Sequence, residues 1–321
     1  GHLAGLDKYV IEPTDGLWNR VAYVETTAGS IYGGNPLPGP GGTLFQDGPY
    51  TITARPGDLA VVAVGGLRHE LTGEFVPVRM GVVRFLFMPL RGTIEGADGV
   101  LDVVLDHQIA VTLLEPPYDW QRGPDTMTLQ SWLEFFPEGF YAPHNTVEGQ
   151  GFDTWVRYLP EPDATPLADV QLHLETGLYT AGTRPYSVVW TGSVPLATET
   201  LAIGPFVGIP RLREPTGVIS LTDEYRFAWT IQGGVEPDVY SLRMLGPDLA
   251  VAWRLIFAGP QRSFQLPRVP GVFEIPRGRS FISMTAGRAP VFSIDSFEYR
   301  HLSVRTWDAW SLDYVDFLYA P

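Results

Sequence analysis

The chain has 321 residues, a formal net charge of −14, no cysteine, 35 glycines and 29 prolines. Hydrophobic residues make up 45% of it, which excludes disorder through a shortage of core formers. The acidic balance opposes binding to nucleic acid, and the lack of cysteine excludes disulfides, thiol catalysis and cysteine-ligated metal sites. Frequent glycine and proline also disfavour long helices.

Predicted strands follow one another along the chain, separated by turns rich in glycine, proline and aspartate. The clearest covers 101–113, where apolar residues alternate with mostly polar ones. Such period-two alternation buries one face of a strand and is typical of antiparallel sheets. In chain order, strands are predicted at 50–54, 59–64, 76–88, 101–113, 129–136, 154–158, 170–178, 186–194, 226–231, 239–245, 251–258 and 280–284.

Stretches rich in glycine or proline near residues 95 and 208 interrupt the strand pattern. Cuts there give three domains, 1–95, 96–208 and 209–321, each the size of one β-sandwich. Short strands separated by turns at roughly ten-residue spacing are typical of sandwiches. The predicted fold is therefore all-β, with three consecutive antiparallel β-sandwich domains.

Residues 47–65 resemble a carboxypeptidase-regulatory-like repeat. In that family a strand of pattern G-x-Y-x-I/L, a Pro-Gly turn and a second strand form a hairpin of a transthyretin-like sandwich. Here 48–52 carry the first pattern, Pro56-Gly57 the turn, and 59–63 the second strand, with Leu59 in place of the commoner tyrosine. The resemblance implies such a hairpin within 1–95.

Residues 210–286 resemble a fibronectin type III domain. Trp229 stands where that family buries the tryptophan of its first sheet, and 278–286 resemble its Y-x-W/F-x-V-x-A strand. Arg279 and Phe281 depart from the family's tyrosine corner. The last domain is thus expected to be an immunoglobulin-like or fibronectin type III-like sandwich, while 96–208 resemble no family that we can name.

Together the two resemblances imply an exported bacterial surface protein or lipoprotein. The expected role is non-enzymatic: structural display, adhesion or assembly through other surface proteins or self-association. No apolar run reaches 18 residues, so we expect no transmembrane helix. The printed chain starts at Gly1 without an export signal, and we expect any such signal to have been removed.

Catalytic signatures are missing from the sequence, which contains no G-x-S-x-G, H-E-x-x-H or Walker motif. The acids Glu134, Glu148 and Asp153 lie near several aromatic residues and offer a glycosidase pair, although an ordinary sandwich edge has the same composition. We expect no enzyme, with an accessory part of a glycoside hydrolase as the alternative.

We also expect no cofactor. Calcium is the alternative, because acids lie close together at 161–163 and at Asp308 and Asp313, and carboxylate oxygens suit that ion. No D-x-D-x-D-G loop accompanies them.

Aromatic residues offer the best candidates for ligand binding. Tyr118 and Trp120 flank Asp119 in a proline-flanked loop, and Trp307 and Trp310 bracket Asp308. Exposed rings beside acids stack on sugars in carbohydrate-binding modules, but rings in such places also pack within or between domains. Three functions stay open: a surface adhesion or display protein, a carbohydrate-binding module, and a self-assembling fibre or virion subunit.

Overall fold

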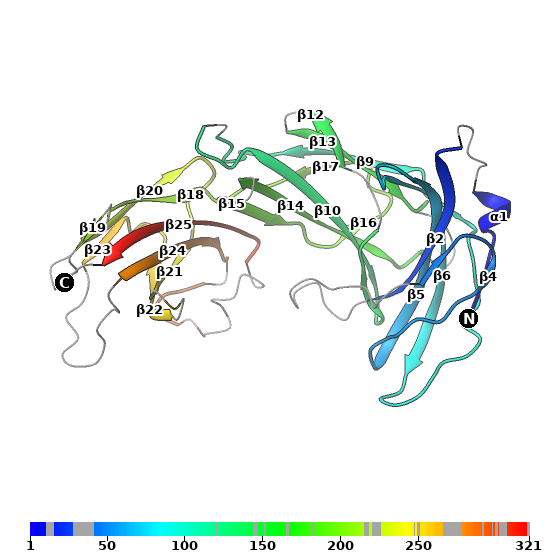
Figure 1. Cartoon of the computed structure of the whole chain (residues 1–321). Helices are drawn as coiled ribbons and strands as arrows, with labels where there is room; N and C mark the ends of the chain where they lie inside the picture. Colours follow the sequence, from blue (N-terminus) through cyan, green and yellow to red (C-terminus); the bar gives the residue numbers. More distant parts are fainter. Residues whose placement is uncertain are drawn as a thin grey trace. The chain divides into compact units, whose positions relative to one another are not determined.

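The protein is nearly all β in its computed structural model (Figure 1). Besides the strands, the described residues form one four-residue helix, α1 (Leu6–Tyr9). Almost all strand pairs are antiparallel, so the predicted all-β fold of antiparallel β-sandwich type is confirmed. The structure describes residues 1–10, 16–27, 42–119, 121–143, 147–150, 152–162, 164, 167–180, 183–214, 218–219, 226–246, 248, 251–265, 278–290, 292–296, 298, 301 and 307–319.

The first compact unit consists of Gly1–Thr112, Leu129–Leu174 and Thr191–Leu201. Its largest sheet has the strand order β3-β2-β5-β6-β8, and smaller sheets have the orders β4-β1-β7 and β12-β13-β9-β17. In addition, β11 pairs with β10, and β16 pairs with β14. The strands that lie wholly or partly in this unit are β1 His2–Ala4, β2 Trp18–Thr26, β3 Gly42–Leu44, β4 Gly48–Pro49, β5 Gly57–His69, β6 Phe75–Met88, β7 Gly99–Val100, β8 Val103–Val104, β9 His107–Leu113, β10 Thr126–Phe135, β11 Gly139–Tyr141, β12 Val147–Gln150, β13 Asp153–Leu159, β14 Gln171–Thr180, β16 Val194–Pro195 and β17 Thr200–Ile203.

Strand β5 is the central element of this unit and is buried on both faces from Leu59 to Gly66. Its apolar run suits that position, because a strand covered on both sides needs no polar face. On one face, Leu59, Val61 and Ala63 pack in a core with residues of α1 and of the segments around 50 and 100. The core of the unit therefore lies against this sheet.

The strand predicted at 101–113 is divided into β8 and β9. β8 pairs with β6, whereas β9 pairs with β13 in another sheet. The chain changes sheets near residues 105 and 106, yet Leu101, Val103, Leu105, Ile109 and Val111 all remain buried. The predicted alternation is confirmed, and the prediction of one continuous strand is wrong.

The hairpin implied by the carboxypeptidase-regulatory-like resemblance is absent from the described structure. Residues 50–54 form no strand there, and β5 pairs instead with β2 on one edge and β6 on the other. Because both edges of β5 are occupied, residues 50–54 have no edge to join. The prediction of a strand at 50–54 is therefore wrong.

The second compact unit consists of Leu113–Thr128, Glu175–Trp190 and Ala202–Pro321. One sheet has the order β18-β20-β23, and in the other β15, β25, β24, β21 and β22 follow one another. The predictions at 239–245 and 251–258 coincide with β21 and β22. The bounds are β15 Thr183–Trp190, β18 Ile209–Glu214, β19 Val218–Ile219, β20 Arg226–Gln232, β21 Val239–Leu245, β22 Val251–Ala258, β23 Ser263–Gln265, β24 Gly278–Arg288 and β25 Ala309–Tyr319.

Aromatic rings join the two sheets of this unit. Trp229 of β20 contacts Tyr240 of β21 edge-on, with ring centroids 5.3 Å apart, and contacts Phe257 of β22 at 5.7 Å. Phe257 in turn lies 4.8 Å from Phe264 of β23. Trp229 is buried, as predicted, and the unit is a β-sandwich with an aromatic core.

The predicted domains 1–95, 96–208 and 209–321 stay a prediction. The two compact units describe how the chain packs, and residues 96–208 contribute to both of them. Across the described part of the chain, no helix is long and apolar enough to span a membrane.

Candidate functional site

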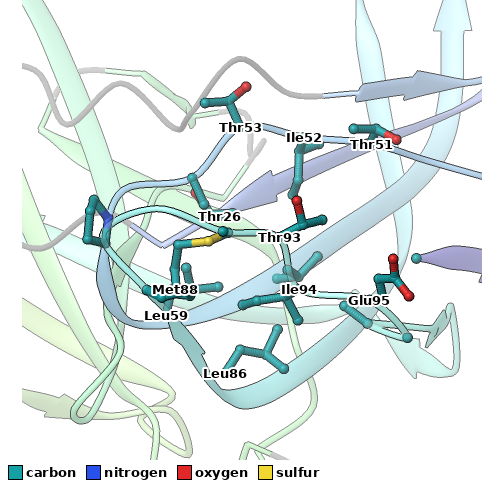
Figure 2. Close-up of a pocket in the computed structure, with 18 of the residues that line it drawn as sticks. Thr26, Thr51, Ile52, Thr53, Leu59, Leu86, Met88, Thr93, Ile94 and Glu95 are labelled. Atoms are coloured by element: carbon teal, nitrogen blue, oxygen red, sulfur yellow. The ribbon is translucent and has the colours of Figure 1, made fainter.

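A cavity of about 540 Å³ opens in the first unit (Figure 2). Two loops, 50–56 and 89–97, form it over β5 and β6, and the Tyr50 hydroxyl ties them together by donating to the Ala97 carbonyl. Figure 2 shows Leu59, Leu86, Met88 and Ile94 beneath the loop that carries Thr51, Ile52 and Thr53. Its size lies within the range of small-molecule pockets. The lining offers apolar side chains, threonine hydroxyls and one carboxylate, Glu95.

A buried ion pair lies elsewhere in the same unit. Arg84 of β6 donates from Nε to Glu138 Oε1 at 2.9 Å and from Nη2 to Glu138 Oε2 at 3.0 Å, a bidentate geometry. The Phe85 N–H also donates to Glu138 Oε1, at 3.0 Å. Asp169 adds a second carboxylate on Arg84. Burial alone would raise the pKa of Glu138, but the bonds from Arg84 and Phe85 outweigh it and hold this pKa below its ordinary value.

Phe85 (74% exposed) and Phe136 (75%) adjoin this ion pair, and Phe87 (66%) is exposed two residues further along β6. The Arg84 guanidinium lies 4.7 Å from the centroid of the Phe85 ring and donates to the Phe136 carbonyl at 3.1 Å. Phe85 has a φ of 59°, a conformation rare for a bulky residue, and its amide is held by Glu138. We call Phe85, Phe87 and Phe136 the aromatic patch.

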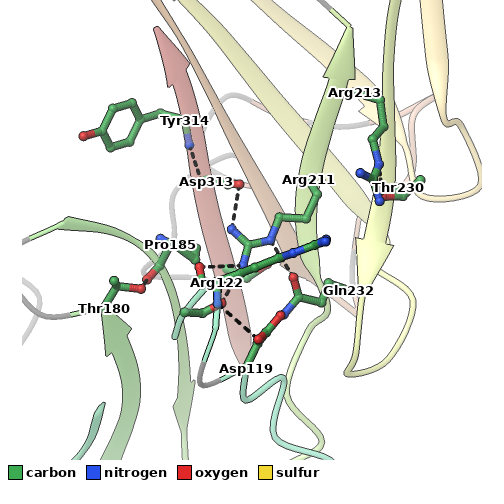
Figure 3. Close-up of polar contacts among 12 residues, drawn as sticks. Asp119, Arg122, Thr180, Pro185, Arg211, Arg213, Thr230, Gln232, Asp313 and Tyr314 are labelled. Atoms are coloured by element: carbon green, nitrogen blue, oxygen red, sulfur yellow. Dashed lines mark hydrogen bonds and ion pairs between the residues drawn. The ribbon is translucent and has the colours of Figure 1, made fainter. Parts of the chain in front are cut away.

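The second unit contains a polar cluster centred on Arg211 of β18 (Figure 3). Its guanidinium donates to Gln232 Oε1 at 2.6 Å, to Asp313 Oδ2 at 3.1 Å and to the carbonyls of Arg122 and Gly123. Burial raises the pKa of Asp313, although Arg211 opposes that rise. The cluster therefore joins β18, β20 and β25 to the loop at 119–123.

Asp119, the acid of the predicted Tyr118–Trp120 site, belongs to that loop. Its Oδ1 accepts from the Gln121 and Arg122 amides at 2.9 and 3.1 Å, and its Oδ2 accepts from Gln232 Nε2 at 3.2 Å. These bonds direct the carboxylate into the protein. Its observed role is to hold the loop in place.

The four predicted aromatic site residues have different environments. Tyr118 is 45% exposed, and Trp120 lies outside the described residues. Trp307 is only 3% exposed, packs with Val239 and Ala289, and donates from Nε1 to the His301 carbonyl at 2.8 Å. A buried ring cannot stack on a sugar, so the binding platform predicted at Trp307 is corrected to a core position. Trp310 is half-buried and contacts Tyr186 edge-on at 4.9 Å.

Four of the predicted acids, Glu134, Asp153, Asp308 and Asp313, have partners of their own. His173 Nε2 lies 2.7 Å from Glu134 Oε2, and Thr112 donates to Asp153 Oδ1 at 3.0 Å. Asp308 faces Arg288, and Asp313 faces Arg211. Within the described ranges, no group of three or more His, Asp or Glu residues is placed to hold a metal ion.

No protein-family model matches the chain, and no curated protein matches it. Among solved structures, the four N-terminal Ig domains of Dscam1 isoform 6.9 align at 11% identity and a TM-score of 0.21, over 95% of this chain and 66% of that one. A tetra-tandem repeat from the extending region of a large adhesion protein aligns at 13% and 0.22, over 93% and 67%. The chain spans about two thirds of each, and these scores carry no argument about function.

The Arg84–Glu138 pair yields a test of stability. We expect Arg84→Met to lower the free energy of unfolding by about 3–5 kcal/mol, because it leaves the Glu138 carboxylate buried without its cation. The double variant Arg84→Met/Glu138→Leu is expected to regain much of that loss, since it buries no lone charge. Denaturant unfolding followed by circular dichroism measures both, and equal losses in the single and double variants would contradict this role.

The same pair predicts a pH dependence. Because the folded-state pKa of Glu138 lies below the ordinary value of 4.5, its ionisation stabilises the fold fully above that pH. The contribution is lost as the pH falls through the lowered pKa. The difference in unfolding free energy between wild type and Glu138→Gln should therefore be constant from pH 7 to about 5 and shrink at lower pH. For the exposed control Glu74→Gln we expect a difference within about 0.5 kcal/mol throughout; a difference for Glu138→Gln that grows in acid would refute the assignment.

Proposed function

We propose that the protein is a non-enzymatic surface protein that acts by contacting other proteins, in structural display, adhesion or assembly. The aromatic patch is the observation that carries this proposal. Each of its three phenylalanines is at least 66% exposed. Exposed apolar surface that includes aromatic side chains is characteristic of protein–protein contact sites.

The support beneath the patch agrees with a contact role. The Arg84 side chain is buried, and its guanidinium donates to Glu138, Asp169 and the Phe136 carbonyl. A contact surface that is already ordered before binding loses less entropy on association. A rigid cation beneath exposed rings is a means of presenting those rings in one fixed arrangement.

For 209–321 we propose a fibronectin type III-like domain. Two features support it: the three-stranded sheet β18-β20-β23 opposite the sheet that holds β21, β22, β24 and β25, and the buried Trp229 between them. Export to a bacterial cell surface is part of the same proposal and rests on the resemblance of that domain. Carbohydrate binding is the competing function, and exposed Tyr118 is the predicted platform residue that would serve it.

Adhesion under flow tests the proposal. Beads coated with the full chain are passed over surfaces that carry the same chain, a panel of extracellular proteins, or a panel of glycans. We expect retention on at least one protein surface and at least a tenfold loss for Phe85→Ser/Phe87→Ser/Phe136→Ser, since exposed aromatic anchors each contribute more than about 1 kcal/mol.

Leu71→Ser is the matched control, because Leu71 is exposed in the turn between β5 and β6, away from the patch residues in sequence. It should adhere like the wild type. Retention on glycans alone, unaffected by the triple variant, would replace the proposed function with carbohydrate binding.

A further inference from the structure

The cavity between loops 50–56 and 89–97 has no part in the proposed protein contact, because none of the aromatic patch residues lines it. Its floor is the beginning of β5 and the end of β6, where Leu59 and Leu86 lie directly opposite each other. Leu59 belongs to the buried core of the unit, and the half-buried Leu86 and Met88 pack against that core. The floor of the cavity is therefore an apolar surface continuous with the core.

Apolar and polar side chains alternate along the two loops, and the polar ones are the more exposed (Figure 2). The half-buried apolar residues are Ile52, Ala54 and Ile94, and the exposed polar residues are Thr51, Thr53, Thr93 and Glu95. The polar groups of the cavity therefore lie toward the solvent and its apolar groups toward the core. A ligand that matches this division has an aliphatic part and a polar end.

Glu95 determines which polar end suits the cavity. Among the described residues of the lining, it is the only one with a charged side chain. None of the ion pairs between described residues includes it. The Gly1 amine also lies in the lining and donates to the Tyr50 carbonyl at 3.3 Å. A carboxylate without an ion-pair partner attracts a cation and repels an anion, and the net charge of −14 acts in the same direction.

The walls of the cavity are held in place without a ligand. The Tyr50 hydroxyl of one loop donates to the Ala97 carbonyl of the other. At their opposite ends the loops join β5 and β6 through Pro56 and Pro89, whose rings restrict the backbone. A cavity that is formed in advance loses less free energy to ordering when a ligand enters.

We propose that this cavity binds a small amphipathic amine, a molecule with an aliphatic chain and a primary ammonium group. The chain lies on the floor formed by Leu59, Leu86 and Met88 and displaces water from it. The ammonium group lies on the solvent side, where it pairs with the Glu95 carboxylate and can donate to threonine hydroxyls. This inference goes beyond the proposed contact role and does not rest on it.

Isothermal titration calorimetry of the full chain at pH 7 with octylamine, octanol and octanoate tests the proposal. The three probes have the same number of carbons and differ in charge, because the amine is protonated and the acid is ionised at that pH. We expect octylamine to bind saturably and about fivefold more tightly than octanol, since an exposed ion pair contributes up to about 1 kcal/mol. Octanoate should bind most weakly.

Two substitutions separate the polar and the apolar contribution. Glu95→Gln should remove the preference for octylamine over octanol, whereas the control Glu74→Gln, an exposed glutamate outside the lining, should keep it. Ile94→Ala removes part of the apolar wall. It should weaken the binding of octylamine and octanol by at least about threefold each and leave octylamine the tighter of the two, because fewer methylene groups are then buried.

The absence of saturable octylamine binding would overturn the proposal, as would equal or tighter binding of octanol or octanoate. A preference for octylamine that Glu95→Gln leaves intact would overturn it as well. The variant Phe85→Ser/Phe87→Ser/Phe136→Ser should keep its affinity for octylamine, because none of these residues lines the cavity. Failure of the calorimetric test with adhesion intact would thus remove this inference alone.

Discussion

A β-strand has two backbone edges, and each edge must meet a neighbouring strand or water. That requirement organises the whole chain. β5 meets it with β2 and β6, and β24 meets it with β21 and β25 from Phe281 to Gly287. The side chains then determine which faces of each sheet are buried. Where a described sheet ends, the chain uses short strands, proline or charge, and β22 is the longest of these terminal strands and carries one charge, Arg254.

The strands that the sequence predicts best are those that belong to one sheet along their whole length. β21 and β22 match their predicted bounds because turn residues flank each apolar run and each strand stays in one sheet. Residues 101–113 keep the predicted alternation but change sheets, and alternation does not say which strand lies alongside. Strand β25 is absent from the predictions, because Asp313 and Asp316 interrupt its apolar pattern. One of those acids is buried against Arg211.

The polar sites join residues that lie far apart in the sequence. Arg84 and Glu138 are 54 residues apart, and Arg211 and Asp313 are 102 apart, so no local spacing predicts either pair. An arginine within the apolar run of β6 is the one signal that a buried partner exists. Aromatic content pointed to ligand platforms, yet Trp307 fills a core, and the three most exposed rings among the described residues are Phe85, Phe87 and Phe136. Composition counts rings, and only packing shows which ones face water.

Residue-resolved amide hydrogen exchange of the unliganded full chain tests the central claim, that β22 is paired on one side and β24 on both. The account predicts slow exchange at every amide of β24 from Phe281 to Gly287, where strands pair with it on both sides. In β22 between Trp253 and Ala258, slow and fast amides should alternate, because only every second N–H meets β21. Uniform protection of β22, equal to that of β24, would show that its outer edge is already covered and would contradict the account.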